Sequence, residues 1–294
     1  MFVAPRPVVA STPRRTQSLW AIATDPHHHP IAPKRPVGFY TRAAMEKQSD
    51  LIDEAWGLLS SGGGAVVRPS VPILWFGDSV AFSNSGVRVV TVGLNPSRVE
   101  FPEGDRFLRF PAARLLTTPP ATALQRLAYV SALDSYFRAA PYRRWFDQGF
   151  ERVLNGLSAT YYQGLPNVAL HTDLLSLLAT DPTWSRLAND ERASLAHGGP
   201  PLWHKLIRLL RPDVVVASVA REHLDRILFP RLGSWRVIHT VDRDRPFVTE
   251  AVDIEVVPGK RTLLVFGRCV SIPFGSVSHQ SKLAIGSAIA ADRA

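Results

Sequence analysis

The sequence predicts an α/β fold, a three-layer α/β/α sandwich around a central, mostly parallel sheet of four to five strands. Three observations lead to this prediction. Short β-rich runs alternate with stretches whose apolar residues have helical spacing. The run Val214–Val216 is apolar at every position, which is typical of a parallel strand covered on both faces. Turn residues such as Asn95-Pro96 follow the expected strands, as in chains that alternate strands with helices.

The expected elements begin with a helix over 48–59, whose apolar residues lie on one face and which Gly62-Gly63-Gly64 ends. The other expected helices cover 121–139, 145–154, 202–210 and 220–228. The expected strands cover 73–76, 87–92, 168–170, 214–216, 236–239 and 263–266.

Composition narrows the class of protein. The chain has 294 residues and a net charge of +9, and its 34 basic residues are 29 arginines and five lysines. Arginine pairs with phosphate oxygens bidentately, so this surplus suits a nucleic acid, although it also suits a solvated surface. The single Cys269 excludes an internal disulfide, a four-cysteine zinc site and a cysteine-ligated iron–sulfur cluster. No apolar run approaches the roughly 18 residues of a membrane span, so we expect an intracellular, cytoplasmic protein.

Two parts of different composition are expected. Residues 1–44 are rich in proline and arginine and predict a disordered leader, with an organelle transit peptide as the alternative. The run His27-His28-His29 lies in this leader and has no fixed geometry for a metal. Residues 45–294 are expected to form one catalytic domain.

Four short stretches carry the candidate chemistry. They are 91–97 (Thr-Val-Gly-Leu-Asn-Pro-Ser), 171–175 (His-Thr-Asp-Leu-Leu), 209–218 (Leu-Leu-Arg-Pro-Asp-Val-Val-Val-Ala-Ser) and 279–283 (His-Gln-Ser-Lys-Leu). Singly, each has an ordinary structural interpretation as a turn, a strand end, a core unit or a surface loop. Ligands of open parallel sheets bind outside the carboxyl ends of the strands, so stretches that follow strands indicate a site.

Together and in this order, the four stretches resemble the motifs of the uracil-DNA glycosylase superfamily, over about residues 70–290. Residues 93–96 resemble its Gly-x-Asn-Pro turn, and 279–283 resemble its His-Pro-Ser-Pro-Leu motif without both prolines. The resemblance implies a uracil-DNA glycosylase-like fold and a DNA partner. It also implies a monofunctional DNA glycosylase that needs no cofactor and no metal, and we expect a monomer.

The resemblance implies a role for each site residue. Asn95 would hold the attacking water, and His279 would donate a hydrogen bond to oxygen 2 of the departing base. Leu283 would fill the gap that the flipped base leaves, and Phe107 is the candidate stacking face, with Phe101 and Phe110 as rivals. DNA-backbone contacts are expected from Gly275, Ser278 and Ser281, with Arg98, Arg106, Arg109, Arg143 and Arg144 as further candidates. Because no lysine is well placed for a Schiff base, strand cleavage is not expected.

Two departures from the superfamily concern the substrate. Asp173 stands where uracil-specific relatives have an asparagine, and its carboxylate accepts from the amino group of cytosine, or donates to ring nitrogen 3 when protonated. Ser97 stands where they have a bulky tyrosine, which leaves room at carbon 5 of the base. These residues favour a 5-modified cytosine, unless Thr172 or His171 occupies the reading position.

Three functions therefore follow from the sequence. The first is excision of a modified pyrimidine to leave an abasic site, which would suit defence against phages that carry modified cytosine. The second is base-excision repair of uracil or damaged pyrimidines. The third is a catalytically silent nucleic-acid-binding module. A nucleotide-binding regulator is disfavoured, because Gly62-Gly63-Gly64 follows a helix and lacks the Lys-Ser/Thr of a phosphate loop.

Overall fold

The computed structural model describes residues 42–116, 118–269 and 271–293. The expected leader, with its three histidines, lies outside these residues, except for 42–44. Those three already belong to the first helix, α1 (Arg42–Ser61). No helix among the described residues is long and apolar enough to cross a membrane.

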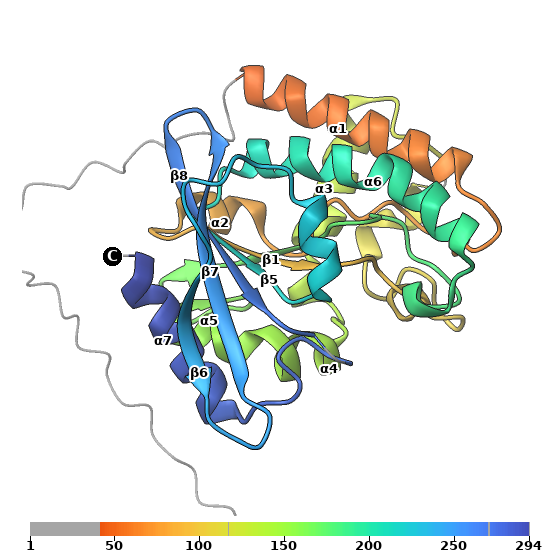
Figure 1. Ribbon diagram of the computed structural model, residues 1–294. Helices are drawn as coiled ribbons and strands as arrows, with labels where there is room; N and C mark the ends of the chain where they lie inside the picture. The colour runs from red at the N-terminus through yellow and green to blue at the C-terminus, as the bar shows by residue number, and fades with distance from the viewer. Residues whose placement is uncertain (1–41, 117, 270, 294) are drawn as a thin grey trace, which may run out of the picture. The chain divides into compact units, whose positions relative to one another are not determined.

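A mixed sheet of six strands forms the centre of the fold (Figure 1). The strands lie in the order β4 (Leu170–Asp173), β1 (Val89–Gly93), β5 (Val214–Ala217), β8 (Lys260–Gly267), β7 (Phe247–Val257) and β6 (Arg236–Val241). The first four are parallel, and β7 and β6 extend the sheet antiparallel. A separate pair, β2 (Ala159–Thr160) and β3 (Asn167–Val168), is also parallel.

Helices cover both faces of this sheet (Figure 1). On one face α6 (Asn189–Leu210) packs beside α1, and its Trp203 Nε1 donates to Thr172 Oγ1 of β4 at 3.0 Å. On the other face lie α4 (Arg143–Phe146), η4 (Asp147–Glu151), α5 (Arg152–Gly156) and α7 (His279–Arg293). The remaining helices are α2 (Ser79–Asn84), η1 (Arg98–Glu100), η2 (Pro111–Leu115), α3 (Ala123–Asp134), η3 (Tyr136–Arg138), η5 (Trp184–Arg186) and η6 (Arg221–Arg226).

Two glycines let α5 and α7 cross with their backbones in contact. A Cβ at Gly156 would lie 2.2 Å from the carbonyl oxygen of Leu283, and a Cβ at Gly286 would lie 2.1 Å from that of Val153. Only glycine permits so close an approach. The crossing fixes where α7 begins, and therefore where His279 lies.

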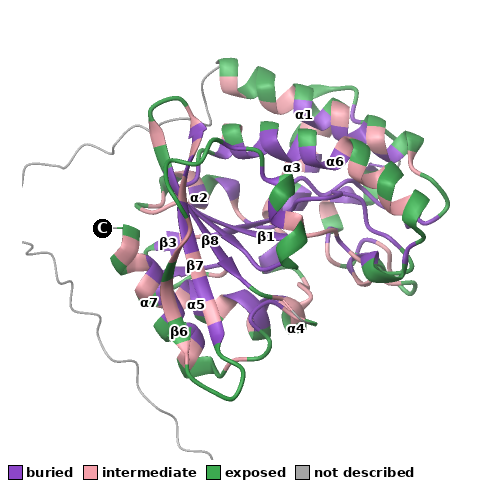
Figure 2. Cartoon of the chain, in the orientation of Figure 1, coloured by how far each residue is buried: buried purple, intermediate pink, exposed green. Residues whose placement is uncertain are grey.

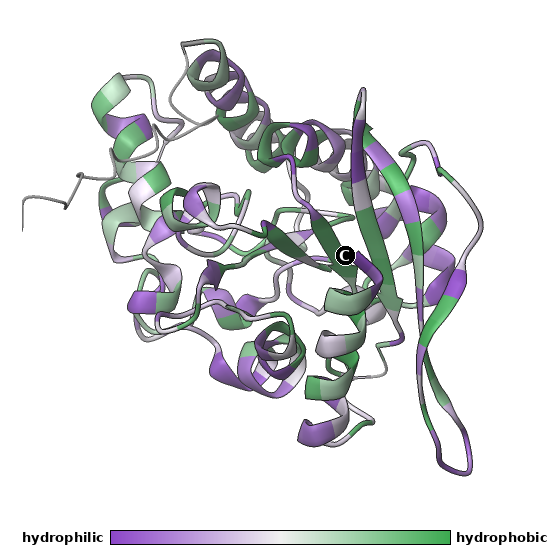
Figure 3. Ribbon diagram, turned by 90° about the vertical axis from the view of Figure 1, so that its left-hand side faces the viewer, coloured by the Kyte–Doolittle hydropathy of each residue, from purple (hydrophilic) through white to green (hydrophobic). Residues whose placement is uncertain are grey.

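Burial follows the sheet (Figure 2). Every residue of β1, β4 and β5 is buried, whereas buried and partly exposed residues largely alternate along β7. The parallel strands are hydrophobic along their length, and the far end of the β6–β7 hairpin is hydrophilic (Figure 3). Fully buried strands are typical of a parallel sheet between two helical layers, and this confirms the predicted α/β class.

The predicted elements differ from the structure in four places. The sheet has six strands rather than four to five, because β7 was not expected. Residues 73–76 form no strand and meet β4 only through a bridge between Phe76 and His171. The predicted helix over 220–228 is the short 3₁₀ helix η6. The strand expected over 168–170 lies at 170–173 instead, so His171, Thr172 and Asp173 form the strand rather than follow it.

Candidate active site

The carboxyl ends of β1 and β4 are joined by backbone hydrogen bonds. The amide of Leu174 donates to the carbonyl of Gly93 at 3.0 Å, and the amide of Thr180 donates to that of Pro96 at 3.2 Å. The amide of Arg98 donates back to the Thr180 carbonyl at 3.0 Å. The turn that carries Asn95 is therefore fixed to the segment that follows β4, at the edge where ligands of parallel sheets bind.

The Asn95 carboxamide is held by its nitrogen. Nδ2 donates to Thr180 Oγ1 at 2.9 Å and to the Pro96 carbonyl at 2.8 Å. No described residue donates a hydrogen bond to Oδ1, and the side chain is half-buried. The arrangement leaves a fixed acceptor oxygen, which is the group that the predicted water-positioning role requires.

Asp173 ends β4 with a buried carboxylate. Its side chain is 4% exposed, and no residue in the described part of the chain donates a hydrogen bond to it. The one basic side chain within ion-pair distance among the described residues is His171, whose Nε2 lies 3.7 Å from Oδ1. The neighbouring strand gives it room, since a Cβ at Gly93 would lie 2.6 Å from Oδ1. Among the described residues, the fully buried side-chain atoms without a hydrogen-bond partner are Trp56 Nε1 and Thr249 Oγ1, so the Asp173 oxygens are not sealed from solvent.

The two alternatives for the reading position are engaged elsewhere. His171 Nδ1 lies 2.8 Å from Thr91 Oγ1, which also bonds to the hydroxyl of Tyr161. The His171 ring packs between Phe146 and Phe150, with centroids 5.2 and 5.5 Å away. Thr172 faces the opposite side of the sheet, toward Trp203. Among the three candidates, Asp173 alone keeps unpaired oxygens.

A second buried carboxylate, Glu100, was not predicted from the sequence. The Tyr136 hydroxyl donates to its Oε2 at 2.7 Å, and Arg109 Nε lies 3.8 Å from the same oxygen. Burial raises the pKa of Glu100 from 4.5 to about 7; the Tyr136 hydrogen bond and Arg109 oppose this rise, and the charge of Asp173 adds to it. Glu100 and Asp173 are therefore electrostatically coupled across the end of β1.

The fourth motif lies at the start of α7 rather than in a loop. Ser278 Oγ accepts from the amide of Ser281 at 3.1 Å, so Ser278 caps the helix. The side chain of His279 is exposed, and no described residue forms a hydrogen bond with it. Leu283 is 38% exposed on the first turn. Gly275 closes a tight turn, with its amide donating to the Ile272 carbonyl at 3.0 Å.

Lys282, inside the same motif, points inward. The side chain is 3% exposed, and its Nζ donates to the carbonyl of Gln148 in η4. Burial lowers the pKa of Lys282. The lysine thus fastens α7 to η4 and does not face solvent.

Two further predicted residues lie in packed surroundings. Phe107 is 9% exposed and packs edge-on against Phe101, whose ring centroid is 6.3 Å away. Phe101 and Phe110 are fully buried and stack on each other. Ser97 Oγ accepts from the amide of Val99 at 3.4 Å and begins η1. These contacts give Phe107 and Ser97 structural roles. Their roles in base recognition stay predictions.

The structure brings Asn95, Ser97 and Asp173 together at one sheet edge, and no contact joins His279 to them. The segment before α7 lies near this region, because Pro273 contacts Gly149 and Phe274 lies 6.1 Å from Phe150, ring to ring. A cavity of about 240 Å³ lies beside Tyr161, and one of about 550 Å³ lies beyond Arg98. Neither is lined by Asn95, Asp173 or His279.

No group of three His, Cys, Asp or Glu side chains among residues 42–293 that are described has the arrangement of a metal site. Burial raises the pKa of the Cys269 thiol to about 11. No family model matches the chain, and no curated protein matches it significantly. The site must therefore be interpreted from its own geometry.

Proposed function

We propose that this chain is a monofunctional DNA glycosylase that flips a pyrimidine out of DNA and hydrolyses its N-glycosidic bond, with 5-modified cytosine as the preferred base. One observation carries the proposal. Asn95 Oδ1 and the Asp173 carboxylate are two acceptors without hydrogen-bond donors, and they lie at the ends of adjacent parallel strands. Both oxygens are free to accept hydrogen bonds, and we infer that they serve a ligand.

Each acceptor has a task in the reaction. Asn95 Oδ1 would accept a hydrogen bond from water and hold it against the sugar, where positive charge grows as the bond breaks. Asp173 would accept from the exocyclic amino group of cytosine, which uracil lacks. His279 would donate to oxygen 2 of the base, where negative charge develops.

Lys282 supports the monofunctional part of the proposal. A glycosylase that also cleaves the strand forms a Schiff base between an amine and the sugar. Lys282 Nζ is buried against the Gln148 carbonyl, away from solvent. We therefore expect abasic sites that break only in alkali, and no adduct that borohydride traps.

Binding of a base requires some rearrangement. Because neither cavity reaches Asp173, the side chains around its carboxylate have to move when a base enters. Enzymes that act on flipped bases often close over the base in this way. Among the parts that carry proposed site residues, the side chains on the first turn of α7 are the most exposed.

The test is a panel of single- and double-stranded oligonucleotides that carry uracil, mismatched thymine, cytosine or 5-modified cytosine, each followed by alkali. We expect alkali-dependent breaks at 5-modified cytosine. Asp173→Asn should move the preference toward uracil, because an amide donates to oxygen 4 as well as accepting. Asp292→Asn, the same chemical change at an ion-paired position of α7, is the control.

Two outcomes would replace the proposal. Release of uracil alone, with the same preference in Asp173→Asn, would indicate ordinary uracil repair. Absence of abasic sites from every substrate, with normal DNA binding by an Asn95→Ala, His279→Ala double variant, would indicate a silent binding module.

A further inference from the structure

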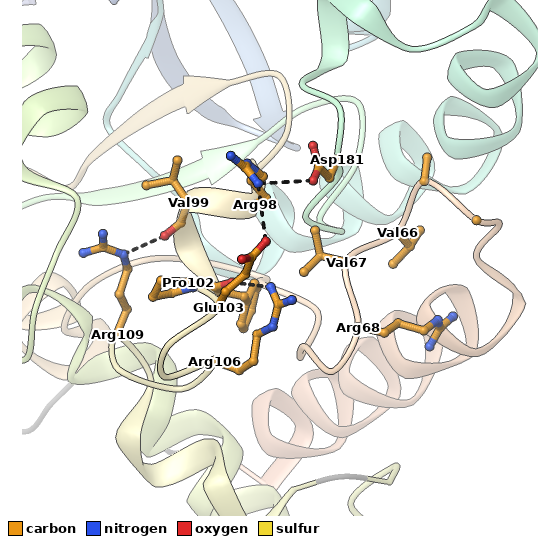
Figure 4. A pocket seen from close by; sticks show the side chains of 13 residues that line it. Val66, Val67, Arg68, Arg98, Val99, Pro102, Glu103, Arg106, Arg109 and Asp181 are labelled. Carbon is orange, nitrogen blue, oxygen red and sulfur yellow. Dashed lines mark hydrogen bonds and ion pairs between the residues drawn. The ribbon is translucent and has the colours of Figure 1, made fainter.

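A groove of about 550 Å³ lies beside the candidate active site (Figure 4). Its charged lining residues are Arg68, Arg98, Glu103, Arg106, Arg109 and Asp181. Four arginines against two acids leave a net charge of +2 on the lining. We call this feature the arginine groove.

The groove is continuous with the loop that holds Asn95. Thr180 Oγ1 accepts from Asn95 Nδ2, and the Thr180 carbonyl accepts from the amide of Arg98. Asp181, the next residue, and Arg98 both line the groove. A strand lying in the groove would therefore pass directly beside the proposed site of hydrolysis.

Three of the arginines are oriented by backbone carbonyl groups. Arg106 Nη1 donates to the Phe101 carbonyl at 2.7 Å, and Arg68 Nη2 donates to the carbonyls of Leu59 and Gly62. Arg109 Nε donates to the Val99 carbonyl at 2.9 Å. A carbonyl fixes the guanidinium but does not cancel its charge. Arg109 pairs with Glu100, whose pKa burial raises to about 7. Because Glu100 is only partly ionised near that pH, it offsets only part of the charge of Arg109.

The fourth arginine behaves differently. Arg98 lies 3.6 Å from both Glu103 and Asp181, so its charge is balanced within the groove. Figure 4 shows Arg109, Arg106 and Arg68 one after another across the groove, with the linked Arg98, Glu103 and Asp181 above them. Arg68 and Arg106 have no ion-pair partner among the described residues, and with Arg109, which pairs with Glu100, they form a row that suits an extended anion.

We infer that the arginine groove binds the phosphodiester backbone of a single nucleic-acid strand, through Arg68, Arg106 and Arg109. The inference rests on the proposed function in one respect, that the bound strand is DNA that flanks a flipped base. Planar guanidinium groups take phosphate oxygens in pairs, and their contacts position a strand without reading its sequence.

The experiment measures binding of a short fluorescein-labelled oligothymidylate by fluorescence anisotropy, over about 50 to 200 mM salt. Each phosphate contact to a single strand contributes about 0.7 to the slope of log K against log salt. In an Arg68→Gln, Arg106→Gln double variant we expect that slope to fall by about 1.4 and the affinity to fall at least about tenfold. Glutamine keeps a polar side chain that donates hydrogen bonds but carries no charge.

Two controls separate charge from structure. The Arg68→Lys, Arg106→Lys variant keeps the charge and should restore most of the slope. Arg261→Gln removes an exposed arginine that pairs with Asp253 near the start of β8, and should leave the slope unchanged. Thermal unfolding of each variant verifies that it is folded.

Several outcomes overturn the inference. Unchanged slope and affinity in the glutamine variant would do so, as would failure of the wild-type chain to bind the strand. Competition by inorganic phosphate as effective as that by the unlabelled strand would show a site for a compact phosphate instead. If the glutamine variant binds normally while the wild type releases a base, the inference fails and the proposed function stands. If the glutamine variant loses binding while the wild type releases no base, the inference stands and the proposed function fails.

Discussion

Carboxylates near the antiparallel strands β6 and β7 differ in their ion pairs from those at the carboxyl ends of the parallel strands β1 and β4. On the antiparallel side, Asp253 of β7 lies 3.2 Å from Arg236 and 2.7 Å from Arg261, and Asp292 of α7 lies 2.5 Å from Arg236. At the carboxyl ends of the parallel strands, Asp173 has no Lys or Arg partner among the described residues and lies 3.7 Å from the His171 ring, and Glu100 pairs only with Arg109 at 3.8 Å. Yet the parallel-side carboxylates are the more deeply buried.

This contrast indicates what each region is for. Burying a charge without compensation opposes folding, whereas an ion pair near the surface is almost neutral for stability. On the antiparallel side the acids form local ion pairs, and the pair between Asp292 and Arg236 holds α7 against the sheet. The parallel side keeps Glu100 buried, which raises its pKa, and leaves the oxygens of Asp173 and Asn95 without hydrogen-bond donors, and function is the reason that we propose.

The largest expected effect is at Asn95. Asn95→Ala removes the acceptor that would fix the attacking water, and misplacing a reactant lowers the rate by about 100-fold, or about 2.7 kcal/mol in the barrier. Asn95→Asp keeps an acceptor oxygen and should retain most activity. Single-turnover release of the base measures both. Equal loss in the two variants would contradict the water-positioning role and point to the Thr180 contact instead.

The next effect is the pH dependence of stability at Glu100. Its pKa is about 7 in the folded chain and 4.5 in the reference state, so the folded state binds the proton more tightly. This stability is present below pH 4.5 and is lost as pH rises through 7. Between pH 5 and pH 8 the loss amounts to about 2 to 3 kcal/mol.

Glu100→Gln removes this titration while leaving an oxygen to accept from Tyr136. Urea unfolding at pH 5 and pH 8 should therefore show a smaller loss of stability in the variant than in the wild type. A loss of the same size in both proteins would show that Glu100 does not titrate in this range.

The difference between the two sides also explains what the sequence could predict. The parallel strands β1, β5 and β8 contain apolar runs such as Val214–Val216, and these runs identified them, whereas β4 contains His171, Thr172 and Asp173 and was expected at 168–170. β7 was missed although apolar and polar residues alternate along much of it, because Asp253 and Glu255 interrupt any apolar run. The 73–76 run is equally apolar, but Trp75 and Phe76 are buried among helices and loops, and only Phe76 meets a strand.

The sequence offered a signal only for candidate residues that lie at or after the end of a strand. Asn95 and Asp173 carry recognisable turn and strand-end positions in the sequence. Glu100 has no such signal, because its burial depends on Tyr136 and Arg109, which lie in other elements of the fold. Arg68 was missed for the same reason, since it joins Arg106 only when the segment after α1 meets the loop after β1.

A smaller effect tests the close packing at the end of β1. Gly93→Ala would place a Cβ 2.6 Å from Asp173 Oδ1 and 3.1 Å from His171 Nε2. Overpacking of this kind costs about 1 to 3 kcal/mol, and it should also displace Asp173 and abolish base release. Gly57→Ala, in open space at an exposed position of helix α1, should instead stabilise the chain by about 0.5 to 1 kcal/mol. Urea unfolding measures the stability of both variants and the wild type. If Gly93→Ala were as stable as the wild type, the ends of β1 and β4 would adjust freely to the added Cβ.

The smallest effect lies on the antiparallel side. Asp292→Ala removes one of the two carboxylates beside Arg236, whose side chain is 36% exposed. Solvent screens such a pair, and Asp253 remains to accept from Arg236, so the free energy of unfolding should fall by less than about 1 kcal/mol. Base release should not change, because α7 stays fastened through the Gly156–Gly286 crossing and Lys282. A loss of activity in this variant would mean that the ion pairs of the antiparallel side help to position His279, and the separation between a stabilising side and a functional side would no longer hold.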